Sequence, residues 1–304
     1  MRPFRFGYQL REGSAADLRE QAIGAEQAGI DVVHSWDHVA DGWGPLAALV
    51  AVAACTTRVR VGPLVLNNDF HHPVCLAQEL ATIDHVTGGR LEVGIGAGHS
   101  FTEYEAIGLR FDPPAVRKAR LAEAVEVIRR LLDGEVVSFA GDHYQLAGVR
   151  TLRSAQEHVP ILVGVNGKRA LAHAARHADI IGLTMMGRTL EDGHRHEVRW
   201  EPGRLDATIA DIREQAGERS DQLELNALVQ AFVVTDDRRA AARQFVGAVP
   251  SLTEEDALTT PFLAFGTHDE IAEHFLACRQ RWGISYFSVR DFGAIAPVIE
   301  RLRL

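Results

Sequence analysis

Residues 59–98 read VRVGPLVLNNDFHHPVCLAQELATIDHVTGGRLEVGIGAG and contain two apolar stretches on either side of a helical pattern. The first stretch, 59–67, ends in polar residues, and the second, 91–96, ends in alternating glycines. A strand that is apolar on consecutive residues is buried on both faces, which is typical of a parallel sheet covered by helices. The carboxyl ends of such strands form the edge where α/β proteins bind ligands. This unit therefore predicts both a fold class and the position of a site.

The same alternation of strand and helix continues along the chain. Helical patterns are clearest at 73–86, which opens with Pro73, and at 116–133. Eight strands that alternate with helices over roughly 250–300 residues match an α/β fold of the (β/α)8 TIM-barrel type. We therefore expect one barrel domain over residues 1–304. The expected strands are 4–10, 31–37, 59–67, 91–96, 161–165, 180–185, 223–234 and 284–289.

Two segments interrupt this alternation. Residues 135–146 read EVVSFAGDHYQL and alternate with a period of two around Gly141-Asp142, which predicts a hairpin inserted before the fifth strand. Residues 186–204 are rich in Gly, His, Arg and Glu, which makes them too polar for a regular element. We expect a long loop there, over the mouth of the barrel.

Composition narrows the class of function. The chain has 32 Lys and Arg against 41 Asp and Glu, a formal net charge of -9. No basic excess offsets phosphate repulsion, which argues against nucleic acid as the main partner. A basic start followed by a long apolar run is missing, so neither a signal peptide nor a membrane span is predicted. Cys55, Cys75 and Cys278 lack zinc or redox spacing, and we expect them reduced in a cytoplasmic protein.

Asp37 and His38 stand at the expected end of the second strand, in the segment HSWDHVADGW (34–43). This pair suits proton transfer, because imidazole titrates near neutrality and a carboxylate can orient it. Adjacent strand residues point to opposite faces, however, so the two side chains need not touch each other. The alternative is that both satisfy loop amides or cap the next helix.

The glycine run GIGAG (94–98) is not a dinucleotide fingerprint, because that pattern requires glycine at 99 and His99 stands there. Small residues at this position let a flat ligand or a neighbouring loop approach the backbone closely. Tight packing at a barrel turn explains the spacing equally well.

A phosphate site is predicted after the fifth strand. That strand runs into Asn166-Gly167, and Lys168-Arg169 then open the following helix. Cations at a helix N-terminus oppose the macrodipole unless an anion lies there. We therefore expect a phosphate over these amides, with Arg117 adding a bidentate contact. Two solvated surface cations are the alternative.

Other candidate ligands carry less information. The pairs His71-His72 and His194-x-His196 come with no clear third ligand, so we expect no metal. Four aromatic residues at strand ends or in the loops after them can wall a planar cofactor: Trp36, Trp43, Phe70 and Phe101.

Together these segments resemble the luciferase-like superfamily, barrel enzymes that use a flavin or the deazaflavin coenzyme F-420 (also written F420). The matching pieces cover most of the chain in the family's order. They are PLVLNNDFHHPVCLAQELATID, GGRLEVGIGAGHSFTEYEAIGLRFD, RKARLAEAVEVIRRLLDGEVVSF, GDHYQL, PILVGVNGKRALAHAARHAD and FGTHDEIAEHFLACRQRWGISYFSVR.

The resemblance implies roles for particular residues. Asp37-His38 looks like the deazaflavin-dependent branch, where such a histidine lies near the reactive face of the ring. His38 would then exchange a proton with substrate, and Asp37 would help form the polar wall. The family commonly has a non-prolyl cis peptide bond at the end of the third strand, which aligns near Leu64-Val65. The implied cofactor-binding residues are Leu64, Val65, Leu66, Asn67, Gly96, Ala97, Gly98, Arg117, Asn166, Gly167 and Lys168.

The expected function is hydride transfer between coenzyme F-420 and a small organic substrate, and we expect a homodimer. In one respect the chain departs from the branch, whose glucose-6-phosphate dehydrogenases carry a glutamate directly after the glycine run. Here His99-Ser100 stand at that place, with Glu103 and Tyr104 further on, which argues against sugar-phosphate oxidation.

Three alternatives to this function remain. One is an FMN-dependent luciferase-like monooxygenase that receives reduced flavin from a separate reductase. Another is a cofactor-binding barrel without turnover, against which the polar residues retained at the barrel mouth argue. A sugar-phosphate lyase or isomerase would need a lysine or paired carboxylates at inner strand ends, and the sequence shows none.

Overall fold

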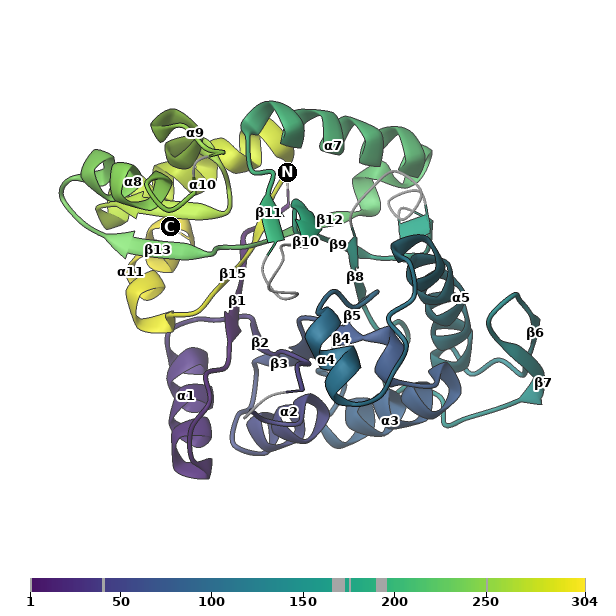
Figure 1. Ribbon diagram of the computed structural model, residues 1–304. Coiled ribbons are helices and arrows are strands. Elements are labelled where there is room, and N and C mark those ends of the chain that lie inside the picture. The colour runs from purple at the N-terminus through teal and green to yellow at the C-terminus, as the bar shows by residue number, and fades with distance from the viewer. Residues whose placement is uncertain are drawn as a thin grey trace.

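The computed structural model describes residues 2–39, 42–165, 173–174, 176–189, 196–249 and 251–303. A parallel sheet curls into a barrel at its centre, and helices pack around the outside (Figure 1). In order of pairing, the strands are β3 (Arg60–Pro63), β2 (Val32–Ser35), β1 (Arg5–Gln9), β15 (Tyr286–Val289), β12 (Glu224–Leu228), β9 (Ile180–Leu183), β8 (Ile161–Val165), β5 (Val93–Gly96) and β4 (Leu66–Asn67).

The two edges of this sheet are pieces of a single expected strand. Residues 59–67 form β3 and then β4, and a cis peptide bond between Leu64 and Val65 lies between them. A parallel bridge between Val61 and Leu91 joins the β3 edge to the segment that leads into β5. The sheet therefore closes with eight strand positions, which confirms the predicted barrel.

The helices mostly alternate with these strands. They are α1 (Ala15–Gln27), α2 (Pro45–Ala54), α3 (Pro73–Val86), α4 (Phe101–Ala106), α5 (Pro114–Leu132), α7 (Pro202–Ala216), α8 (Arg238–Val246), α9 (Glu254–Thr259), α10 (His268–Trp282) and α11 (Phe292–Arg303). Helix α3 shows how the sequence specifies them. Pro73 occupies the first turn, where no amide donor is needed, and the His72 side chain accepts from the Val74 amide. Its buried face, which includes Leu76 and Leu80, packs towards α5. No helix in the described ranges is both long and apolar enough to cross a membrane.

Of the two predicted insertions, one is confirmed and one is corrected. The hairpin is present as antiparallel strands β6 (Val137–Ala140) and β7 (Gln145–Val149). The segment 186–204 is not a plain loop, because its described part contains the antiparallel strands β10 (Met186–Thr189) and β11 (His196–Val198) and the start of α7. The two strands are short and mostly polar in sequence, so no apolar alternation indicated them.

The expected strand 223–234 was also wrong in extent. Only β12 joins the barrel, and the rest of the segment forms β13 (Ala231–Val234), which pairs in parallel with β14 (Leu263–Gly266). Helices α8 and α9, which the sequence did not predict, lie beside this small sheet. Apolar residues predominate on both sides of Gln230, so the sequence pattern did not indicate the break between the two strands.

Candidate active site

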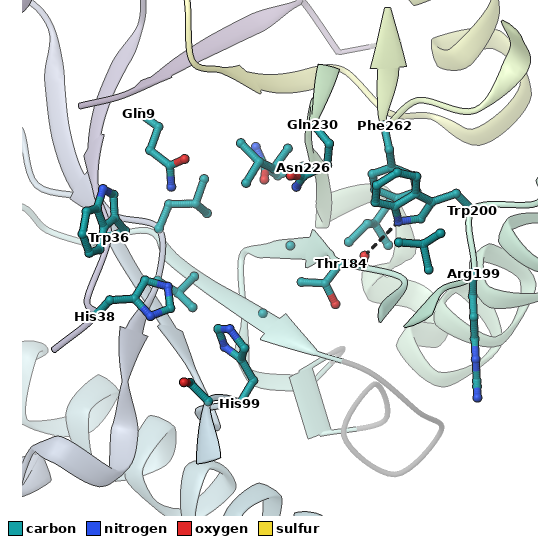
Figure 2. A pocket seen from close by; sticks show the side chains of 18 of the residues that line it. Gln9, Trp36, His38, His99, Thr184, Arg199, Trp200, Asn226, Gln230 and Phe262 are labelled. Atoms are coloured by element: carbon teal, nitrogen blue, oxygen red, sulfur yellow. Dashed lines mark hydrogen bonds between the residues drawn. The ribbon is translucent and has the colours of Figure 1, made fainter. Parts of the chain in front are cut away.

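A cavity of about 980 Å³ lies over the carboxyl ends of the barrel strands. Gln9 comes from the end of β1, and other lining residues follow β2, β5, β12 and β15. In Figure 2, Trp36, His38 and His99 lie on one side of this cavity, while Trp200 and Phe262 lie on the other. Pockets for cofactors and small ligands measure about 300–1,000 Å³, so this cavity has room for a cofactor.

A histidine–glutamate pair stands in the cavity wall. His38 follows β2, and its Nδ1 lies 2.7 Å from Oε1 of Glu103, on α4. The Val39 amide donates to the other carboxylate oxygen of Glu103 at 3.3 Å. Glu103 is buried, with 9% of its surface exposed, so the carboxylate is held in one orientation. A carboxylate so placed orients an imidazole and stabilises its protonated form, which is the arrangement that general acid–base catalysis uses.

Asp37 directs its carboxylate to a different element from its neighbour. Its Oδ2 accepts a hydrogen bond from the Asn67 amide at 2.9 Å and lies 3.2 Å from Nε2 of His71. Asp37 thus ties the end of β2 to the end of β4, and it also lines the cavity. This is the loop-amide role that the sequence left open for it. The carboxylate beside His38 comes from 65 residues further along the chain.

The turn after β5 requires glycine at one position. Gly98 has φ of +71°, and a Cβ there would lie 2.2 Å from the Tyr104 hydroxyl and 2.5 Å from Oδ1 of Asn67. That hydroxyl donates to Asn67 Oδ1 at 3.0 Å and also lies 3.1 Å from Asp69. Burial and the nearby Asp69 charge raise the pKa of Tyr104 well above its usual value. Tyr104 therefore stays a neutral donor that joins the β4 and β5 ends.

Arg117 lies behind this turn. Its guanidinium donates to the carbonyl oxygens of Ala97 at 3.2 Å, Gly98 at 3.4 Å and Asp112 at 2.5 Å. It also lies 3.8 Å from the centre of the Phe111 ring. Burial lowers the pKa of Arg117, and it is not among the residues that line the cavity. In the described structure Arg117 therefore holds the glycine turn against α5.

A row of glycines forms one side of the barrel mouth. Gly96, Gly164 and Gly182 are register partners on β5, β8 and β9. A Cβ on Gly96 would lie 2.9 Å from the Val65 side chain, and one on Gly182 would lie 3.0 Å from Leu162. Gly164 and Gly182 line the cavity, so part of its wall is bare backbone. A flat ring can approach such a wall closely.

Several expected residues need a separate account. Five of the expected cofactor-binding residues line the cavity: Leu64, Val65, Leu66, Asn67 and Gly98. Gly96 and Ala97, which directly precede Gly98 in the sequence, do not line it. The predicted phosphate loop, Asn166 to Lys168, falls outside the described residues. The described residues contain no group of three or more His, Cys, Asp or Glu that could hold a metal. His99, which the sequence noted only as a departure, packs edge-on to His38 with ring centres 5.3 Å apart.

The barrel, the cofactor-sized cavity and the carboxylate–imidazole pair define a TIM-barrel protein with the features of an enzyme site. The chain belongs to the luciferase-like monooxygenase family, whose model matches residues 1–286. The superfamily resemblance predicted from the sequence is therefore confirmed.

Relatives and solved structures add detail. An F420-dependent glucose-6-phosphate dehydrogenase from Nakamurella multipartita is 32% identical over 248 residues, covering 78% of this chain and 70% of the relative. A 5,10-methylenetetrahydromethanopterin reductase from Archaeoglobus fulgidus is 29% identical over 242 residues, covering 77% and 68%. Two further F420-dependent glucose-6-phosphate dehydrogenases match over only 51% and 55% of their own length. The structure of the coenzyme F420 dependent tetrahydromethanopterin reductase from Methanopyrus kandleri shares the fold, with a TM-score of 0.76, 19% identity and coverage of 98% and 97%.

Proposed function

We propose that this chain is an oxidoreductase that transfers a hydride between coenzyme F-420 and a small organic substrate. The observation that carries the proposal is the His38–Glu103 pair in the wall of a cofactor-sized cavity. Relatives whose names include F420 support the choice of cofactor.

The described residues fit a flat tricyclic ring. Gly164 and Gly182 leave room for it on one side of the cavity, and apolar Leu64 and Val65 line the wall nearby. Asn67 also lines this wall, and its amide and side-chain oxygen are held by Asp37 and Tyr104. A bound deazaflavin supplies a ring carbon that accepts or donates a hydride and does not form the oxygen adduct that monooxygenation requires. The segments Leu64–Asn67 and 96–98 would hold the ring, and the predicted phosphate contacts at Asn166, Gly167 and Lys168 would hold its tail. Arg117, which bonds to carbonyl oxygens of the glycine turn, would support segment 96–98 from behind.

His38 handles the proton that accompanies the hydride. When a hydride moves to or from a carbon bonded to oxygen or nitrogen, a proton must move at that heteroatom. Nδ1 of His38 takes the bond to Glu103, so the proton exchanged with substrate would be carried on Nε2. The Glu103 charge stabilises the protonated imidazole that forms when His38 acts as base. The Trp36 ring packs beside the imidazole, with ring centres 5.3 Å apart.

The departure at His99-Ser100 weighs less against sugar-phosphate oxidation than the sequence suggested. Glu103 brings a carboxylate into the site from α4, so the site does not lack one. We therefore include glucose 6-phosphate among the substrates to be tested.

Fluorescence titration with oxidised and reduced forms of F-420 and FMN tests the cofactor assignment. We expect F-420 to bind at least tenfold more tightly than FMN, a difference of about 1.4 kcal/mol. Equal affinities, or tighter FMN, would instead favour an FMN-dependent monooxygenase with a separate reductase as its partner, and the family's name includes monooxygenase.

We also infer a homodimer. A surface groove with an apolar side lies between α2 and α3, and Val50 in it is 37% exposed. The groove is lined by Leu46, Ala47, Val50, Cys75, Gln78, Glu79, Thr82 and Ile83. Light scattering should give twice the chain mass for the wild type and a lower mass for Val50→Asp; a monomeric wild type would refute the inference.

The three cysteines are free, which supports the cytoplasm as the location.

A further inference from the structure

Arg290 follows β15 directly and lines the cavity. Its Nε donates to the side-chain oxygen of Gln9 at 3.0 Å. Its Nη1 donates to the side-chain oxygen of Gln230 at 3.1 Å and lies 3.5 Å from that residue's carbonyl. All of these acceptors are neutral, so they orient the guanidinium and leave its charge uncompensated.

The charge on Arg290 has no carboxylate partner in the described part of the chain. The Arg290 side chain is exposed to solvent at the cavity, and partial desolvation lowers its pKa with no neighbouring charge that opposes this effect. Arg204, which also lines the cavity, differs because it pairs with Glu201 at 2.9 Å. Arg199 is a third lining cation, and its side chain extends away from Gln9 and His38 in Figure 2. Among the described residues, none accepts a hydrogen bond from Nη2 of Arg290.

A guanidinium fixed on two sides by amide oxygens presents its remaining N–H groups for a planar or tetrahedral anion. Strand β1 pairs with β2 on one side and with β15 on the other. Arg290 and His38 therefore stand on either side of the β1 end, where Gln9 lies. The ends of β2 and β15 are two strand spacings apart, roughly 10 Å, so a substrate that contacts both groups spans about that distance.

We propose that Arg290 binds an anionic group of the substrate, so that the enzyme acts on organic carboxylates or phosphate monoesters. This inference rests on the proposed function for the reaction itself. The anion is held at Arg290 while the reacting carbon faces His38. Gln9 and Gln230 are positioning residues, because they hold the guanidinium.

Calorimetric titration with benzoate and benzamide tests the anion site directly, because the two probes have nearly the same shape and differ in charge. We expect the wild type to bind benzoate at least tenfold more tightly than benzamide, both without cofactor and with F-420 bound. Arg290→Gln should remove this preference, Arg290→Lys should keep part of it, and the matched control Arg199→Gln should keep it fully. Phenyl phosphate, titrated in parallel, distinguishes a carboxylate site from a phosphate site. Equal binding of the two shape-matched probes by the wild type would overturn the proposal.

A second titration separates the substrate from the cofactor as the source of the anion. We expect Arg290→Gln to bind F-420 within threefold of the wild-type affinity. A loss of tenfold or more in F-420 affinity, with an unchanged preference for benzoate, would assign Arg290 to the cofactor's own phosphate and overturn the proposal. If the wild type binds no F-420, the proposed function fails, and the titration of the cofactor-free protein still decides whether Arg290 binds anions.

Discussion

Glu103 should act in catalysis only through His38, and a double-mutant cycle can measure this. The bond between them is 2.7 Å long and joins a buried carboxylate to an imidazole, so it contributes about 1.5–3 kcal/mol when the imidazole is charged. At about 1.4 kcal/mol per factor of ten, Glu103→Gln should lower kcat about 10- to 100-fold. His38→Ala removes the proton-transfer group itself and should lower kcat by about 10²–10⁴.

The decisive quantity is the effect of Glu103→Gln in the His38→Ala background. If Glu103 serves only to hold and charge-stabilise His38, that effect should shrink to less than about threefold, because the partner is gone. Stopped-flow turnover with whichever enone, imine, alcohol or sugar phosphate the wild type accepts provides the rates. Both variants should keep F-420 affinity within a few-fold of the wild-type value. Glu105→Gln is the matched control, since Glu105 lies exposed on the same helix. Equal effects of Glu103→Gln in both backgrounds would refute the pairing.

Three further predictions concern stability and the cofactor tail. Gly98→Ala should lower the free energy of unfolding, measured in urea, by several kcal/mol, because its Cβ would clash with Tyr104 and Asn67. The control Gly108→Ala, at φ +72° with open space around it, should lower it by only about 1 kcal/mol. Equal losses would mean that the contacts with Tyr104 and Asn67 do not matter. Burial lowers the pKa of both His34 and His274 to about 4, so the unfolded chain binds more protons below pH 6.5. Stability should therefore be full above that pH and fall by at most about 3 kcal/mol per histidine as the pH drops towards 4, and His274→Gln should flatten this dependence. The sequence also predicts that Lys168→Glu weakens cofactor binding by about 1–3 kcal/mol and that this variant's cofactor affinity depends less on salt than the wild-type affinity does. A cofactor affinity that is unchanged in the variant and independent of salt would mean that the cofactor's anion lies elsewhere.

The barrel was predictable because its signals are local. Each inner strand is an apolar run bounded by turns, as at β5 and β8, and helix α3 carries its own start signal at Pro73. The errors occurred where a strand pairs with a partner that no local sequence pattern indicates. Strands β10 and β11 are short and polar, and β13 needs β14, which lies about thirty residues further along the chain.

The site was predictable only in part, because a side chain's partner depends on tertiary packing. The sequence singled out Asp37 and His38 but left open whether they touch, and the structure directs Asp37 to the Asn67 amide and His38 to Glu103. It assigned Arg117 to a phosphate, but a buried guanidinium needs acceptors, and carbonyl oxygens of its own chain provide them. Arg290 went unnoticed, although a cation directly after a buried strand end is a signal that could have found it.

The order of strands in the barrel divides the cavity into two arcs with different chemistry. Along β9, β8, β5 and β4 the lining includes Gly164, Gly182, Leu162 and Leu66, which suit a flat apolar ring. Thr184, Asn67 and His99 add polar side chains to this arc. Along β2, β1, β15 and β12 the lining includes His38, Gln9, Arg290 and Asn226 beside the apolar Trp36 and Leu228, and its polar members suit a polar or charged small molecule. A ring bound against the first arc would present its other face to the second, so hydride and proton would move on the side that His38 and Arg290 share. Substitutions on the glycine arc should therefore change cofactor affinity, and substitutions on the polar arc should change the choice of substrate.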